Sequence, residues 1–105
     1  MAQFSVHRNT NPDTVEAVPY LLNIQSDLIE TLATRIVVPL LPVSAMKGKI
    51  LKTLTPILEI DGKQYVMVTP QLAGVPKRIL GDTVADLSSK RDEIIAALDL
   101  LITGI

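Results

Sequence analysis

The chain has 105 residues and a formal net charge of −1, and although 48% of its residues are apolar, only Phe4, Tyr20 and Tyr65 are aromatic. This length favours one domain, residues 1–105, with a modest core that aliphatic side chains must fill. The near-neutral charge argues against electrostatic binding of nucleic acid, and the absence of cysteine excludes disulfides and thiolate metal sites.

The first forty residues predict three short strands. Residues 4–7 alternate between apolar and polar side chains, which is typical of a half-buried strand. Residues 20–25 and 35–41 are rich in apolar and β-branched side chains and are the second and third candidates. Because Pro39 lacks an amide hydrogen, we expect the third strand to lie at a sheet edge or to bulge at this residue.

The middle of the chain predicts a long connection and then a hairpin. Residues 42–54 carry three lysines and no clear periodicity, so we expect a solvated connection there. Asp61 and Gly62 separate two apolar runs, residues 56–60 and 64–68. Both residue types tolerate the positive φ of a tight turn, which favours a β-hairpin.

The segment after this hairpin offers little regular structure. Two prolines and a glycine within residues 70–76 are typical of loops. We therefore expect only one more short strand, at residues 78–80, before Gly81 and Asp82 turn the chain towards its C-terminal segment.

The C-terminal segment predicts an α-helix over residues 89–102. Ser88 or Ser89 is expected to cap its start, and Gly104 offers the first stop. Its apolar side chains recur at helical spacing and form one face, made of Leu87, Ile94, Leu98, Leu101 and Ile105 with Ile95 and Ile102 beside them. Five to six short antiparallel strands followed by one helix predict a mainly β (α+β) fold.

The chain ends on an apolar residue, Ile105. The last helical turn has no basic side chain to meet its exposed carbonyl groups. Burial of an isoleucine side chain contributes about 1.5–3 kcal/mol, so an apolar terminus suggests that this end is docked. Two interpretations stay open: Ile105 packs against its own sheet, or the tip is a contact surface for another protein.

No residue pattern predicts catalysis, a cofactor or a metal ion. His7 is the only histidine and has no acidic or nucleophilic residue at a suggestive spacing, so we interpret it as structural or as a surface residue. Scattered glycines and carboxylates argue against a phosphate-binding loop or a paired-carboxylate site. The N-terminus lacks the apolar core of a signal peptide, so we expect a soluble cytoplasmic protein with no membrane partner.

Several segments resemble CcdB-type toxins, in order along the chain. The segment NIQSDLIET of residues 23–31, followed by RIVVPL of residues 35–40, is similar to the VQSD–IPL region of that family. The other matching positions are Val75-Pro76, Gly81, VADLS at residues 84–88, and Gly104-Ile105. The segments at residues 9–17 and 47–53 diverge most.

The resemblance implies a toxin of a type II toxin–antitoxin system. Proteins of this family look like SH3-like barrels with a C-terminal helix, form homodimers and inhibit DNA gyrase without catalysing a reaction. They bind the dimerisation domain of the gyrase A subunit and trap the enzyme–DNA complex after cleavage. A CcdA-like antitoxin neutralises them, and the two together repress their operon, so operator DNA is contacted only through the antitoxin complex.

The resemblance also implies where gyrase binds. The positions that carry over are Leu28, Ile29, Asp99, Ile102, Thr103, Gly104 and Ile105. The best-known members end in Trp-Gly-Ile and carry an amide at the position of Asp99, whereas this chain has Thr103 before Gly104. Because aromatic anchors dominate many interfaces, we expect gyrase poisoning to be weaker, to use a shifted contact or to be lost.

Two alternatives stay open. MazF and Kid toxins resemble the same barrel but cut RNA, which requires a positioned acid–base set for which His7 and Arg35 are the candidates to test. The second alternative is a decayed, non-toxic homologue that has kept the fold and antitoxin binding.

Overall fold

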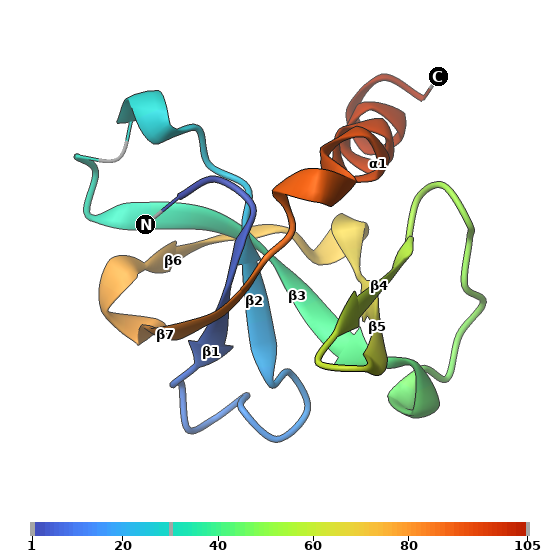
Figure 1. The fold of residues 1–105 in the computed structure, drawn as a ribbon, viewed down its shortest axis with the longest axis horizontal. Coiled ribbons are helices and arrows are strands. Elements are labelled where there is room, and N and C mark those ends of the chain that lie inside the picture. Colours follow the sequence, from blue (N-terminus) through green and yellow to red (C-terminus); the bar gives the residue numbers. More distant parts are fainter. Residues whose placement is uncertain (1, 30, 105) are drawn as a thin grey trace.

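One curled antiparallel sheet carries most of the chain, and a C-terminal helix follows it (Figure 1). The computed structural model describes residues 2–29 and 31–104. Within that part, the strands are β1 (Ser5–Asn9), β2 (Tyr20–Asn23), β3 (Thr34–Pro42), β4 (Ile57–Ile60), β5 (Lys63–Met67), β6 (Ala73–Pro76) and β7 (Leu80–Asp86). The helices are the 3₁₀ turns η1 (Asp27–Ile29), η2 (Val43–Ala45), η3 (Thr69–Gln71), η4 (Lys77–Ile79) and η5 (Ser88–Lys90), and the α-helix α1 (Arg91–Thr103).

The central strand of the sheet is β3. The strand order is β4-β5-β3-β2-β1-β7, and β6 also pairs with β3. Along one edge β3 pairs with β2, and along the other it pairs with β6 at residues 34–37 and with β5 at residues 40–42. Because two strands share this edge, the sheet divides there and curls into a half-barrel. The expected mainly β, SH3-like barrel with a C-terminal helix is confirmed, with seven strands among the described residues in place of five to six.

The prediction that Pro39 marks an edge strand or a bulge is wrong. Its carbonyl accepts a hydrogen bond from the N–H of Val68, directly after β5, at 3.0 Å. The nitrogen and the carbonyl of one strand residue point to the same side of the strand. The missing amide hydrogen therefore falls where β3 changes its partner from β6 to β5, and no ladder bond is lost there.

The core is aliphatic, as the composition predicts. Residues from five strands and from α1 form most of one buried cluster, which includes Val6, Leu22, Val38, Leu40, Leu58, Met67, Ile94 and Ala97. Tyr20 and Tyr65 meet edge to face at its margin, with ring centroids 5.2 Å apart. The hairpin turn at Asp61 and Gly62 is confirmed, since both residues have positive φ between β4 and β5. Residues 46–56 form no strand or helix, as expected of a connection.

The region after the hairpin differs from the prediction. The expected strand at residues 78–80 is wrong, because η4 occupies most of it and β7 begins only at Leu80. The prediction also missed β6, which contains Gly74 and Pro76. This strand pairs with β3 alone, so it is an edge strand, where proline is tolerated.

Gly81 lies within β7 and not in the expected turn. A Cβ atom at this position would lie 2.9 Å from Thr10 Cγ2 and 3.1 Å from the carbonyl oxygen of Arg8. The glycine therefore marks a close approach of β7 to the end of β1, where the register of the pair is also irregular.

The start of α1 also differs from the prediction, whereas its end agrees. The helix begins at Arg91 after η5, and neither Ser88 nor Ser89 caps it through a side-chain hydrogen bond. Instead the N–H of Ser88 donates to Asp86 Oδ1 at 2.8 Å, and this hydrogen bond lowers the pKa of Asp86. Gly104 ends the helix in the left-handed region, with φ 75° and its N–H donating to the carbonyl of Leu100.

We predict opposite effects for alanine at two glycines. Gly81→Ala should lower the free energy of unfolding by about 1–3 kcal/mol, because the new methyl group is forced against the backbone of β1. Gly48→Ala is the matched control, since nothing lies within 4 Å of a Cβ atom there. It should leave the protein unchanged or more stable by up to about 1 kcal/mol. Urea unfolding measures both, and equal effects would contradict the close approach.

Candidate partner-binding surface

Among the large apolar side chains of the described residues, the four with the highest exposed fractions lie in two places. Leu28, which is 94% exposed, lies in η1 with Ile29, and Leu32 follows shortly after. Ile102, which is 76% exposed, lies in the last turn of α1. Exposed apolar residues are normally scattered singly, so three of them in one short loop indicate a contact surface.

Short hydrogen bonds fix the conformation of η1. Ser26 Oγ accepts from the N–H of Leu28, and the carbonyl of Ser26 accepts from the N–H of Ile29, both at 3.2 Å. Asp27 Oδ1 accepts from the N–H of Gln3 at 2.7 Å and ties the turn to the N-terminal segment. Polar groups around the turn are thus bonded within the protein, while Leu28 and Ile29 remain exposed.

Sequence reasoning missed Leu32 and Ile36 as surface residues and Arg35 as a buried one. Ile36 is partly exposed on β3, whereas the neighbouring Arg35 is only 2% exposed. Arg35 Nη1 donates to the carbonyl oxygens of Leu32 and Thr34, at 2.5 and 2.9 Å. Strand alternation separates Arg35 and Ile36 onto opposite faces, but only tertiary contacts decide which face is buried.

The second part of the surface is the tip of α1. The fully buried residues of this helix are Ile94 and Ala97, in its first two turns, and Ile95 and Leu98 are partly buried against the core. The described residues of the predicted site at the tip are all exposed, namely Asp99, Ile102, Thr103 and Gly104. Thr103 Oγ1 donates to the carbonyl of Asp99 at 2.6 Å, so the hydroxyl is bound within the helix. Ile105, which was also predicted to belong to the site, lies outside the described residues.

The two parts do not meet within one chain. Figure 1 shows η1 and the C-terminal end of α1 at the top of the view, on opposite sides of the molecule. The connection between β1 and β2 lies at the bottom, far from both. A partner that contacts both parts must therefore either span this separation or meet them on two different copies of the chain.

Neither candidate for RNA cleavage faces solvent. His7 is buried in β1, with Nε2 2.8 Å from Ser5 Oγ and Nδ1 3.0 Å from the carbonyl oxygen of Gly81. A carbonyl can only accept, so Nδ1 carries a proton and donates to Gly81. His7 is thus a structural residue that joins β1 to β7, and Arg35 is buried as described above.

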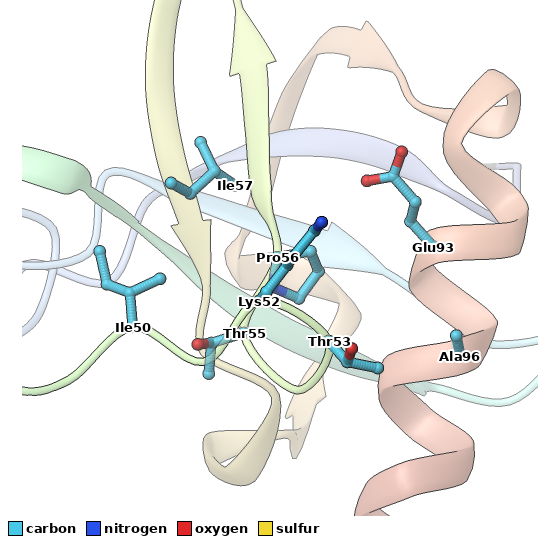
Figure 2. A pocket seen from close by; sticks show the side chains of 8 residues that line it. All are labelled: Ile50, Lys52, Thr53, Thr55, Pro56, Ile57, Glu93 and Ala96. Atoms are coloured by element: carbon cyan, nitrogen blue, oxygen red, sulfur yellow. The ribbon is translucent and has the colours of Figure 1, made fainter.

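A cavity of about 610 Å³ lies between the connection before β4 and the first half of α1 (Figure 2). Its charged groups are Lys52, on the connection, and Glu93, whose carboxylate points towards the gap from α1. Thr55 contributes no free hydrogen-bonding group, because its hydroxyl accepts from the N–H of Leu51 and donates to the carbonyl of the same residue. The remaining walls are mostly apolar, so the cavity offers no acid–base pair in hydrogen-bond contact.

Within residues 2–29 and 31–104, no group of three or more histidine, cysteine or carboxylate side chains is arranged to hold a metal ion. No helix in this part is long and apolar enough to cross a membrane.

Almost the whole chain matches a known protein family. The family model described as CcdB protein matches residues 3–104. The match includes η1, the whole sheet and α1, and therefore both parts of the exposed surface.

We predict that Leu28 contributes nothing to the stability of the fold. Leu28→Ala should change the free energy of unfolding by no more than about 0.5 kcal/mol, because the side chain is already exposed. Leu22→Ala is the matched control, since Leu22 is 0% exposed, and it should destabilise by about 2–5 kcal/mol. Urea unfolding compares the two variants. A comparable loss from both would mean that Leu28 is covered in solution.

Proposed function

Because the chain belongs to the CcdB family, we propose that it is the toxin of a type II toxin–antitoxin system that poisons DNA gyrase. In this proposal it binds the A subunit of gyrase and traps the cleaved enzyme–DNA complex. The observation that carries the proposal is the exposure of Leu28 and Ile102, within the two segments where the family resemblance implies gyrase contacts.

The exposed side chains suit a binding function and not a structural one. Covering a leucine or isoleucine side chain contributes about 1.5–3 kcal/mol, which this fold leaves unused at Leu28 and Ile102. A partner surface that covers both residues and Ile29 recovers this free energy on association. Polar groups of the η1 turn are already bonded within the protein, so a partner need not satisfy them.

The helix tip adds polar specificity to this apolar contact. The carboxylate of Asp99 is exposed near the C-terminal end of α1, where the helix dipole disfavours negative charge. A donor or a cation on gyrase would relieve that repulsion. Thr103 offers only a small surface, since its hydroxyl is bound to the carbonyl of Asp99. Ile105 is included in the proposed contact on the basis of the sequence.

Homodimerisation would bring the separate parts into one surface. A two-fold axis near the helix tips would place the tips of two copies side by side, with the η1 turns on the flanks. Such a surface is itself two-fold symmetric and matches a symmetric target, such as the dimerisation domain of the gyrase A subunit. This arrangement also explains why one copy alone leaves its apolar residues in two separate places.

The proposed action needs no catalytic residue, cofactor or metal ion, because the toxin inhibits by binding. A CcdA-like antitoxin would neutralise it by covering the same dimer, and the complex of the two would repress the operon by binding operator DNA. The site of action would be the cytoplasm, where gyrase and DNA are found. Residues 1–105 would form one toxin domain.

We predict that deletion of residues 103–105 abolishes toxicity and leaves the fold intact. Residues 103 and 104 are exposed and bond only to the last turns of α1, so their loss removes no described core contact. Expression of the full chain should arrest growth with gyrase-dependent DNA breakage, which coexpressed antitoxin relieves. The truncated chain should cause neither growth arrest nor DNA breakage. Its circular dichroism spectrum and melting temperature should stay close to those of the full chain.

Three outcomes contradict parts of this proposal. A truncated chain that unfolds would mean that the tail belongs to the core, and a folded truncated chain that still arrests growth would exclude the tip from the contact. Unimpaired growth with the full, folded chain would indicate a decayed toxin.

The matched control compares two exposed apolar side chains in different places. Leu28→Asp should weaken binding to the gyrase A dimerisation-domain fragment by at least about tenfold, because a charge in an apolar contact must be desolvated. Val15→Asp lies in the connection between β1 and β2, on the far side of the molecule, and should leave binding within about threefold (Figure 1). Titration calorimetry measures both. Equal losses would mean that the effect is one of net charge and not of position.

A further inference from the structure

The side chain of Gln25 continues the sheet beyond the end of β2. This strand ends at Asn23, and the N–H of Ile24 still donates to the carbonyl of Ile36 on β3, at 3.0 Å. The N–H of Ile36 points to the same side of β3, where β2 has already ended. Gln25 Oε1 accepts from it at 3.1 Å and thus takes the place of a backbone carbonyl.

The other half of the same amide holds the η1 turn. Gln25 Nε2 donates to the carbonyl oxygen of Ile29 at 2.9 Å. The orientation of the amide is fixed, because the N–H of Ile36 can only donate and the carbonyl of Ile29 can only accept. One side chain therefore connects the central strand β3 directly to the turn that carries Leu28 and Ile29.

Burial makes this connection firm. Gln25 is only 6% exposed, and a buried amide is tolerated because both its ends are bonded. Shortly after η1, the carbonyl of Leu32 accepts a hydrogen bond from the buried Arg35. The loop that contains η1 and Leu32 is thus bonded to the protein by two buried polar side chains.

We propose that Gln25 is a positioning residue for partner binding: it holds the η1 turn in its binding conformation before the partner arrives. The proposal rests on the proposed binding of gyrase through Leu28 and Ile29. A loop fixed in advance loses little conformational entropy on association, so its apolar contacts translate into affinity. Gln25 itself does not touch the partner in this proposal.

Two substitutions separate the two arms of the amide. Gln25→Met keeps the length and loses both hydrogen bonds, whereas Gln25→Glu keeps an acceptor for the N–H of Ile36 but sets a carboxylate oxygen against the carbonyl of Ile29. Both should weaken binding of the gyrase A dimerisation-domain fragment by about tenfold. Hydrogen exchange of the Ile36 amide should stay slow in the glutamate variant and become fast in the methionine variant.

The matched controls are Gln64→Met and Gln64→Glu. Gln64 is exposed on β5, so these variants repeat the same chemical changes away from the η1 turn. They should bind the fragment within about threefold of the unmodified protein. A folded Gln25→Glu variant that also binds within about threefold would overturn the positioning role, because a merely structural glutamine affects stability and not the affinity of folded protein.

Backbone order parameters of the unmodified protein test the rigidity of the η1 turn directly, even if the Gln25 variants fail to fold. Residues 26–29 should be as rigid as the strands, and order parameters below about 0.6 there would overturn the proposal. Failure of the unmodified protein to bind the gyrase fragment would refute the proposed function and the positioning role with it. Rigid residues 26–29 in that case would show that the connection through Gln25 exists without serving gyrase.

Discussion

The pairing of β3 with three other strands is the constraint on which the structure depends. One edge of β3 is occupied by β2, and the other is divided between β6 and β5 at Pro39, the residue with no amide hydrogen to donate. This division lets the sheet curl around a mostly aliphatic core. It also fixes the place of η1, because β3 extends beyond the end of β2 and leaves the N–H of Ile36 to be satisfied by Gln25. The position of the exposed η1 turn thus follows from the extension of β3 beyond the end of β2.

The aliphatic core determines which part of α1 is free. Ile94 and Ala97 are fully buried, so the first half of the helix is fixed to the sheet. No residue after Ala97 is fully buried among those described, and Ile102 is largely exposed. Leu98 still packs against the core, and Leu100 and Leu101 are half-buried, so contact with the rest of the protein decreases towards the tip. The exposed side chains of the last turn therefore lie outside the region whose burial holds the helix in place.

Local chemistry made some elements predictable from the sequence, and long-range contacts made others unpredictable. The turn at Asp61 and the stop at Gly104 follow from the φ values that their own residues favour. By contrast, Gly81 and Asp82 are residue types that favour a turn, but Gly81 lies in a strand. A glycine is needed there because the backbone of Arg8, which is distant in sequence, approaches it closely. The exposed residues at Leu28 and at the end of α1 were singled out by family resemblance. The role of the buried Gln25 carries no local signal, since its partners, Ile29 and Ile36, come from two different elements.

Different interactions hold the two parts of the surface, so substitutions affect the two parts differently. The conformation of η1 depends on buried groups from outside the turn, so a change beneath it disturbs its shape. At the tip of α1, the bonds made by Thr103 and Gly104 go only to the preceding turn of the same helix. An exposed side chain there can be exchanged with little effect on the core. The departures from the family's pattern, Thr103 and Asp99, both lie at this tip, whereas the QSD segment at residues 25–27 agrees with it. Under the proposed function, affinity for the partner would be adjusted at the helix tip, while the η1 turn would supply a contact whose conformation is held by Gln25 and β3.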